Sequence, residues 1–212
     1  MREIYFPSCN FTKASPRAAR AIRAYLAQRM PVAGCCRVDP QEYPEGASAL
    51  YFCQACRETL EQRAQGKLTP RNIFEYLLED AAFPWPDHSG LTVTVQDCWR
   101  DRDHPEIFAA VRSALSRMNV RIVEMEENRE HSVFCGNLHF EPSKEENRAL
   151  LEEHGDAPLF TLPEEFQRKL MREQVEKYPC ETVVTYCNRC KAGVELGGGK
   201  AMHLMELVTA EL

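Results

Sequence analysis

The sequence predicts an α/β protein made of two duplicated small α/β units, each with a strand that delivers a C-x-x-C motif and a cysteine-rich metal site. Short β-branched runs alternate with helical patterns along the chain, and the cysteines recur twice in one order. The segment 83–90, FPWPDHSG, is rich in turn-forming residues and separates the two copies. We therefore expect a first unit over 1–84 and a second over 85–212, with an insert at about 137–180.

Strand, helix, strand and helix follow one another in the first unit. The apolar run 4–6 predicts a strand that leads into Cys9. Ser15 and Pro16 are favoured at the N-cap and in the first turn of a helix, whose apolar face extends to Leu26. The remaining predicted elements are a strand over 49–52 and a helix over 73–78.

The second unit repeats this order. Residues 91–95, LTVTV, are rich in β-branched side chains and predict a strand that leads into Cys98. Pro105 begins a helix whose apolar face extends to Met118. The remaining predicted elements are a strand over 182–186, a helix over 203–208 and, inside the insert, helices over 143–153 and 163–177.

The spacing of the cysteines is the strongest indication of function. The first copy holds a single cysteine, an adjacent pair and a C-x-x-C, namely Cys9, Cys35, Cys36, Cys53 and Cys56. The second copy lacks one member of the pair and holds Cys98, Cys135, Cys187 and Cys190. Thiols gathered in this way, without an export signal, bind metal more often than they pair as disulfides. We therefore expect a metal or iron–sulfur centre in each copy.

The types of metal that each copy can hold differ. A strand that delivers a C-x-x-C onto the start of a helix suits metal binding, because the free N–H groups there stabilise thiolate sulfur. Adjacent cysteines such as Cys35 and Cys36 diverge, so they suit a cluster in which each sulfur reaches a different iron. Five thiolates also exceed the four that a zinc ion or a cubane takes, so that one sulfur would bridge irons or stand free.

The order C-x(n)-C-C-x(n)-C-x-x-C, present twice over almost the whole chain, resembles the CCG, or cysteine-rich, domain of the heterodisulfide reductase family. Related proteins of glycolate oxidase, lactate-utilisation systems and one type of succinate dehydrogenase share that domain. The resemblance implies a noncubane [4Fe-4S] cluster that cleaves or forms disulfides in one-electron steps. It implies that the five cysteines of the first copy are the ligands of that cluster. It also implies that the four cysteines of the second copy occupy the corresponding ligand positions.

The chain departs from the family pattern at four places, one of which is the short spacing of sixteen residues between Cys36 and Cys53. Arg37 follows Cys36 where the family has glycine, and Asp97 stands where the family has proline. The second copy also has Cys135 in place of an adjacent pair. Its four thiolates suit either a [4Fe-4S] cluster or one zinc ion, and both stay open.

Two functions follow from these sites. The resemblance implies a disulfide-reductase-like oxidoreductase, or a component of one, that acts on a small thiol or disulfide or relays electrons. The sequence contains neither a ferredoxin motif nor a dinucleotide-binding fingerprint, so electrons would come from a ferredoxin- or flavoprotein-like partner. The alternative is a zinc- or cluster-stabilised scaffold or assembly protein without catalysis.

Composition argues against several other classes. The net charge of −6 and the lack of a basic stripe exclude a nucleic-acid partner. No apolar run approaches the roughly 20 residues that cross a bilayer. The first residues, MREIYFPSCN, do not follow the pattern of a signal peptide, so we expect a cytoplasmic protein with reduced thiols.

Several further residues have two readings each. Cys180 is either a small buried hydrophobe or the missing ligand of the second copy. His131, His139 and His203 are either structural or ligands and proton donors at the edge of a site. The run 193–200, GVELGGGK, does not match a phosphate-binding loop, and we expect it to form a flexible cover over the second site.

Overall fold

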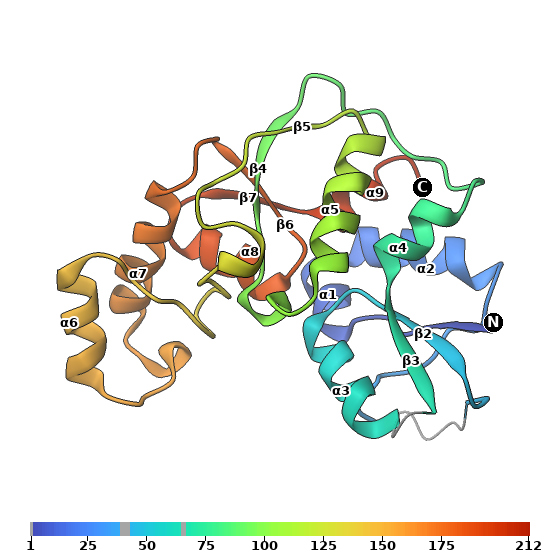
Figure 1. Ribbon diagram of the computed structural model, residues 1–212, viewed down its shortest axis with the longest axis horizontal. Coiled ribbons are helices and arrows are strands. Elements are labelled where there is room, and N and C mark those ends of the chain that lie inside the picture. Colours follow the sequence, from blue (N-terminus) through green and yellow to red (C-terminus); the bar gives the residue numbers. More distant parts are fainter. Residues whose placement is uncertain (1, 39–42, 65–66) are drawn as a thin grey trace. The chain divides into compact units, whose positions relative to one another are not determined.

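The computed structural model describes residues 2–38, 43–64 and 67–212 (Figure 1). The chain divides into two compact units, one formed by Met1–Asp87 with Met205–Leu212 and the other by His88–Leu204. Each unit contains one parallel sheet with helices, so the predicted α/β class is confirmed. None of the helices in the described residues is long and apolar enough to cross a membrane.

The sheet of the first unit has three parallel strands in the order β1-β2-β3. These strands are β1 (Glu3–Tyr5), β2 (Ala47–Tyr51) and β3 (Leu68–Asn72). All five residues of the central strand β2 are buried, as expected for a parallel strand covered on both faces. Cys9 follows β1 and Cys53 follows β2. Because the carboxyl ends of parallel strands meet at one edge of a sheet, these two cysteines lie at the same edge.

The helices of the first unit are α1 (Cys9–Ala14), α2 (Pro16–Ala27), α3 (Gln54–Ala64), α4 (Ile73–Glu79) and most of α9 (Leu204–Val208). Ser15 is the N-cap of α2, as predicted, but its hydroxyl makes no capping bond. It donates instead to the carboxylate of Glu206 in α9. This bond fastens the last segment of the chain to the first unit.

The sheet of the second unit has four parallel strands in the order β5-β4-β6-β7. These strands are β4 (Thr92–Gln96), β5 (Arg121–Ile122), β6 (Thr182–Thr185) and β7 (Lys200–His203). Val95 of β4 lies beside Val184 of β6, and both side chains are buried. Cys98 and Cys187 follow these two central strands and therefore lie at one edge of the sheet.

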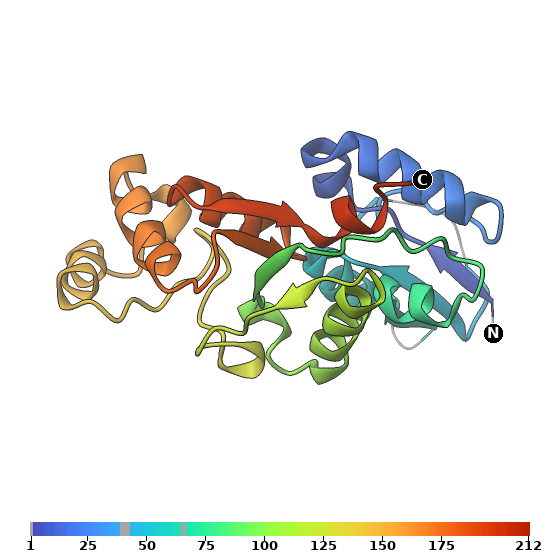
Figure 2. The same ribbon diagram turned by 90° about the horizontal axis from the view of Figure 1, so that it is seen from above.

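The helices of the second unit are α5 (Pro105–Arg117), α6 (Glu145–His154), α7 (Glu164–Glu176) and α8 (Asn188–Leu196). Three short 3₁₀ turns join them, at Trp99–Asp101, Arg129–His131 and Leu159–Thr161. The helices α6 and α7 come from the predicted insert and lie side by side at one end of this unit, as Figure 1 and Figure 2 show.

The glycine run after α8 does not form the flexible cover that we expected. A Cβ atom on Gly197 would lie 2.5 Å from the backbone oxygen of Met171, and one on Gly199 would lie 2.8 Å from the side chain of Val194. These glycines therefore allow the turn after α8 to pack closely against α7. Residues 200–202, for which the sequence predicted no element, and His203, which it placed in the last helix, then form the edge strand β7.

The two units share one order of strands. In each, the strand before the first cysteine pairs with the strand before the C-x-x-C, and this strand pairs with the one after the C-x-x-C helix. The second unit adds β5 at the outer edge of β4. This shared order supports duplication of the units, which stays a prediction from the cysteine spacing.

Candidate metal centres

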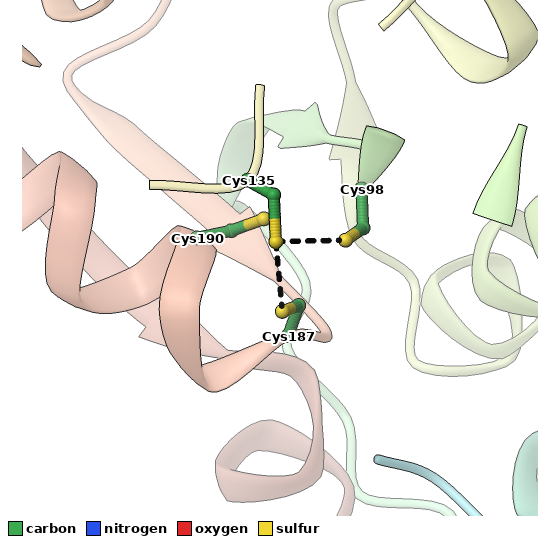
Figure 3. A group of neighbouring side chains, drawn as sticks. All are labelled: Cys98, Cys135, Cys187 and Cys190. Carbon is green, nitrogen blue, oxygen red and sulfur yellow. Dashed lines mark hydrogen bonds between the residues drawn. The ribbon is translucent and has the colours of Figure 1, made fainter. Parts of the chain in front are cut away.

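Four cysteines gather at the edge of the sheet in the second unit (Figure 3). The sulfur atoms of Cys98, Cys135, Cys187 and Cys190 all lie within 4.8 Å of one another. The sulfur of Cys135 is 3.5 Å from that of Cys98 and 4.0 Å from that of Cys187. All four side chains are buried. A buried group of four thiols at this spacing can hold a metal ion or an iron–sulfur cluster.

Three segments bring these sulfurs together. Cys98 follows β4, and the backbone N–H of Trp99 donates to the carbonyl of Phe134 (3.1 Å), which holds the Cys135 loop beside it. Cys187 is the N-cap residue of α8, and Cys190 lies in the first turn of that helix. The C-x-x-C thus places both of its sulfurs at the start of a nine-residue helix, where free N–H groups favour thiolate.

Two glycines allow the Cys135 loop to approach α8. Gly136 has φ +56°, and a Cβ atom there would lie 2.1 Å from the carbonyl oxygen of Arg189. A Cβ atom on Gly193 would lie 2.5 Å from the Cα of Gly136 and 2.8 Å from the ring of Phe134. No side chain fits at either position. Backbone contact at these glycines is what brings Cys135 next to Cys187 and Cys190.

The charges of the four thiols depend on one another. Burial raises the pKa of Cys98 and of Cys190 well above the ordinary thiol value. The hydrogen bond with Cys187 raises the pKa of Cys135, and the same bond lowers the pKa of Cys187. Several adjacent thiolates would repel one another in this buried site. A bound cation would remove that repulsion, so the donor set fits a metal centre that displaces protons when it binds.

A buried ion pair lies next to Cys98, the first of these four cysteines in the chain. The guanidinium of Arg112 donates to both carboxylate oxygens of Asp97, at 2.8 and 2.7 Å, and Asp97 is fully buried. The hydroxyl of Tyr186 donates to Asp97 (3.3 Å) and accepts from the backbone N–H of Cys98 (3.0 Å). Arg112 also binds Glu124, at 2.9 and 2.8 Å. This network therefore links the segments that carry Cys98 and Cys187.

The five cysteines of the first unit are arranged differently. The sulfurs of Cys9 and Cys35 lie 4.0 Å apart. Cys56 forms side-chain hydrogen bonds with Cys36 and with Cys53, and Cys36 is close enough to Cys9 to influence its pKa. In the described part of the chain, only the second unit has three or more potential ligand atoms all within 4.8 Å of one another. The first set is thus a connected but more widely spread group.

The first site is also more open than the second. Cys9 is exposed and Cys35 is half-buried, whereas Cys36, Cys53 and Cys56 are buried. The backbone of the loop before the adjacent pair is fixed to β1, since the N–H of Ala33 donates to the carbonyl of Tyr5 (2.8 Å). The rings of Phe11 and Phe52 pack edge to face, with centroids 4.8 Å apart, and join the segments that carry Cys9 and Cys53.

The Cys36 thiol ionises more readily than an ordinary cysteine. A hydrogen bond from Cys56 outweighs the effect of burial, and Arg37 adds to it, so that the pKa of Cys36 is lowered to about 6. The same hydrogen bond raises the pKa of Cys56. Burial raises the pKa of Cys9, and the hydrogen bond with Cys35 adds to that effect. Arg37, a departure from the family pattern, therefore favours thiolate at its neighbour.

The other candidate ligands lie outside the four-cysteine group. Cys180 is half-buried and is not a member of that group. His131 is exposed and pairs with Glu130, while His203 is buried at the end of β7. The ring of His139 stacks on Trp99 with centroids 3.7 Å apart. Burial lowers the pKa of His139.

Comparison with known proteins identifies no relative, so the function of the two cysteine groups is inferred from their geometry and from the sequence pattern. No family model matches the chain, and no curated protein or solved structure matches it. The resemblance to the CCG domain therefore stays a prediction that rests on the order of the cysteines.

Proposed function

We propose that this protein is an iron–sulfur redox protein of the heterodisulfide-reductase-like type, with its chemistry at the first site and a structural zinc ion at the second. The first site would hold a noncubane [4Fe-4S] cluster on Cys9, Cys35, Cys36, Cys53 and Cys56. The observation that carries this division is the difference in exposure between the two groups of cysteines. A substrate can reach a metal centre whose cysteine ligands are partly exposed. A centre whose cysteine ligands are all buried suits a structural ion.

The distances at the second site support zinc. Tetrahedral coordination with Zn–S bonds of about 2.3 Å separates the sulfurs by roughly 3.8 Å. The two sulfur–sulfur contacts of Cys135, at 3.5 and 4.0 Å, lie on either side of that value. The cysteines of a cubane bind four different irons and point away from its corners, so their sulfurs stand further apart than those around a single ion.

The spread of the first group supports a cluster with several irons. Unlike the four sulfurs of the second unit, these five do not all lie within 4.8 Å of one another, and such a spread suits a core larger than a single ion. When bound, such a cluster supplies one-electron chemistry at a substrate sulfur. The chain would hold the cluster from three segments, with thiolate favoured at Cys36 and one side open at Cys9. Electrons would come from a ferredoxin- or flavoprotein-like partner.

Metal analysis of the anaerobically purified protein tests this proposal. We expect about four irons and an equal amount of acid-labile sulfide at the first site, with zinc close to one per chain. The variant Cys53→Ser should lose iron and sulfide but keep zinc, whereas Cys187→Ser should lose zinc but keep iron. Cys180→Ala is the matched control and should change neither. Zinc at both sites without sulfide would overturn the redox assignment.

The closed second site also favours a second candidate, a scaffold or assembly protein stabilised by its metals. Electron paramagnetic resonance during an anaerobic redox titration separates the two functions. A signal that changes when a thiol or disulfide is added supports catalysis. Silence at every potential, with full metal occupancy, supports the scaffold.

A further inference from the structure

A pocket of about 450 Å³ lies beside the open edge of the first cysteine group, entirely within the first unit. Cys9 and Cys35 both line it. Thr12 and Lys13 line it from α1, where they lie three and four residues after Cys9 and therefore on the same side of the helix. The pocket thus gives a small molecule access to the two most exposed sulfurs of the first site.

The charged residues around this pocket all have the same sign. Lys13, Arg20 and Arg23 line it, and none of the described residues that line it is acidic. All three side chains are exposed, and none forms an ion pair with a carboxylate of the described residues. Elsewhere in this unit, Arg29 pairs with Asp80 and Arg71 pairs with Glu79. These three cations, without an ion pair among the residues that the structure describes, are therefore a local feature in a chain of net charge −6.

We infer that this pocket binds a small organic anion with two or more negative charges and holds it against Cys9 and Cys35. Three cations that pair with no carboxylate of the described residues raise the local concentration of anions and can form charge-assisted hydrogen bonds to carboxylate or phosphate oxygens. The arginines suit such groups because the guanidinium can bind two oxygens at once. The inference deepens the proposed function and rests on it, since it states the charge of the molecule that reaches the first site.

Calorimetric titration of the anaerobic protein, residues 1–212, tests the inference with three probes. These are tricarballylate, which carries carboxylates, glycerol 3-phosphate, which carries a phosphate, and the neutral diamide succinamide. We expect at least one anion to bind with an affinity that falls as salt is added, and succinamide to bind about tenfold more weakly or not at all. The anion that binds more tightly identifies carboxylate or phosphate as the recognised group.

The double variant Arg20→Gln/Arg23→Gln should weaken binding of that anion by about tenfold or more. Arg17→Gln is the matched control, because Arg17 is exposed on the same helix but does not line this pocket. It should leave the affinity within about twofold of the wild type. Thermal unfolding of all variants checks that each is folded.

Three results would overturn the inference: no binding of either anion, equal binding of succinamide, or equal losses in the double variant and in Arg17→Gln. Iron and sulfide are measured in the same samples. Absence of iron with intact anion binding would reject the proposed function alone, whereas full iron without anion binding would reject the anion site alone.

Discussion

The backbones of Gly136 and Gly193 are in direct contact beside the four-cysteine centre, and a Cβ atom on Gly193 would lie only 2.5 Å from the Cα of Gly136. The atom that it would meet belongs to the main chain, so no side-chain rotation can relieve the clash. This contact sets the distance between the loop of Cys135 and the helix α8, which carries Cys187 as its N-cap and Cys190 in its first turn.

Gly193→Ala should therefore separate Cys135 from the C-x-x-C and lower metal content at the second site. Overpacking of this kind costs about 1–3 kcal/mol in the free energy of unfolding. Zinc and iron analysis, with denaturant unfolding, measures both effects. Gly155→Ala is the control: Gly155 has φ +58° but nothing within 4 Å of a Cβ atom, so it should cost stability without changing metal content. Full metal content in Gly193→Ala would contradict the role of the contact.

Cys187→Ser should lower stability as well as remove the second metal, because the metal binds the folded state and stabilises it by mass action. We expect a chelator to lower the melting temperature of the wild type towards that of Cys187→Ser and to have little effect on the variant. Cys180→Ala should respond to the chelator like the wild type. A chelator response of equal size in Cys187→Ser would mean that the metal at this site does not support the fold.

Arg112→Met should destabilise the second unit by about 3–5 kcal/mol, because it leaves the buried carboxylate of Asp97 without its cationic partner. The double variant Asp97→Asn/Arg112→Met removes both charges and should recover part of that loss. Arg168→Ala removes an exposed pair with Glu164 and should change stability by less than about 1 kcal/mol. Denaturant unfolding measures all three. No recovery in the double variant would show that Arg112 acts mainly through packing.

The carboxylate of Glu173 should make stability depend on pH. It accepts from the backbone N–H of Lys144 (3.0 Å) and from the side chain of Asn147 (2.6 Å), and so caps the start of α6. Burial raises the pKa of Glu173, but these hydrogen bonds outweigh it and hold the pKa below its ordinary value of 4.5. The pKa of Glu173 is therefore lower in the folded state than in the unfolded state. Its carboxylate stabilises the fold fully at pH values above the unfolded-state pKa, and this stabilisation is lost as the pH falls through the folded-state pKa.

Comparison of the wild type with Glu173→Gln by denaturant unfolding at several pH values measures this contribution. The wild type should be more stable at pH 7, and the difference should shrink as the pH falls below about 4.5, through the lowered pKa. Glu164→Gln, at an exposed position on the same helix, is the control and should show a smaller difference. If the difference in stability between the wild type and Glu173→Gln does not change with pH, Glu173 stabilises the fold through its packing and not through its negative charge.

The sequence predicted the long helices well, because their apolar residues recur with helical spacing. The α5 and α7 helices begin within one residue of the predicted positions. The two-residue strand β5 was missed, and so were the edge strands β3 and β7: β3 contains Pro70 and is only partly buried, and β7 is four residues long. Neither β3 nor β7 has the alternation or the apolar run that identifies a strand.

The cysteine spacing identified every member of the four-cysteine group, because a C-x-x-C places its two sulfurs close together without help from the rest of the fold. The partners of these ligands had no such local signal. Arg112 and Asp97 meet across fifteen residues, and Gly136 meets Gly193 only because the loop and the helix α8 are packed together. The glycine run was misjudged for the same reason, since α7, against which it packs, is distant in sequence.

The hydrogen bond between Ser15 and Glu206 has a consequence for synthesis on the ribosome. The first unit includes Met205–Leu212, so its N-terminal portion emerges long before the segment that completes it. All residues of the second unit, by contrast, are translated before that closing segment. The first unit thus begins to leave the ribosome before the second unit but is completed after it. A fragment that stops at Asp87 would lack part of the first unit.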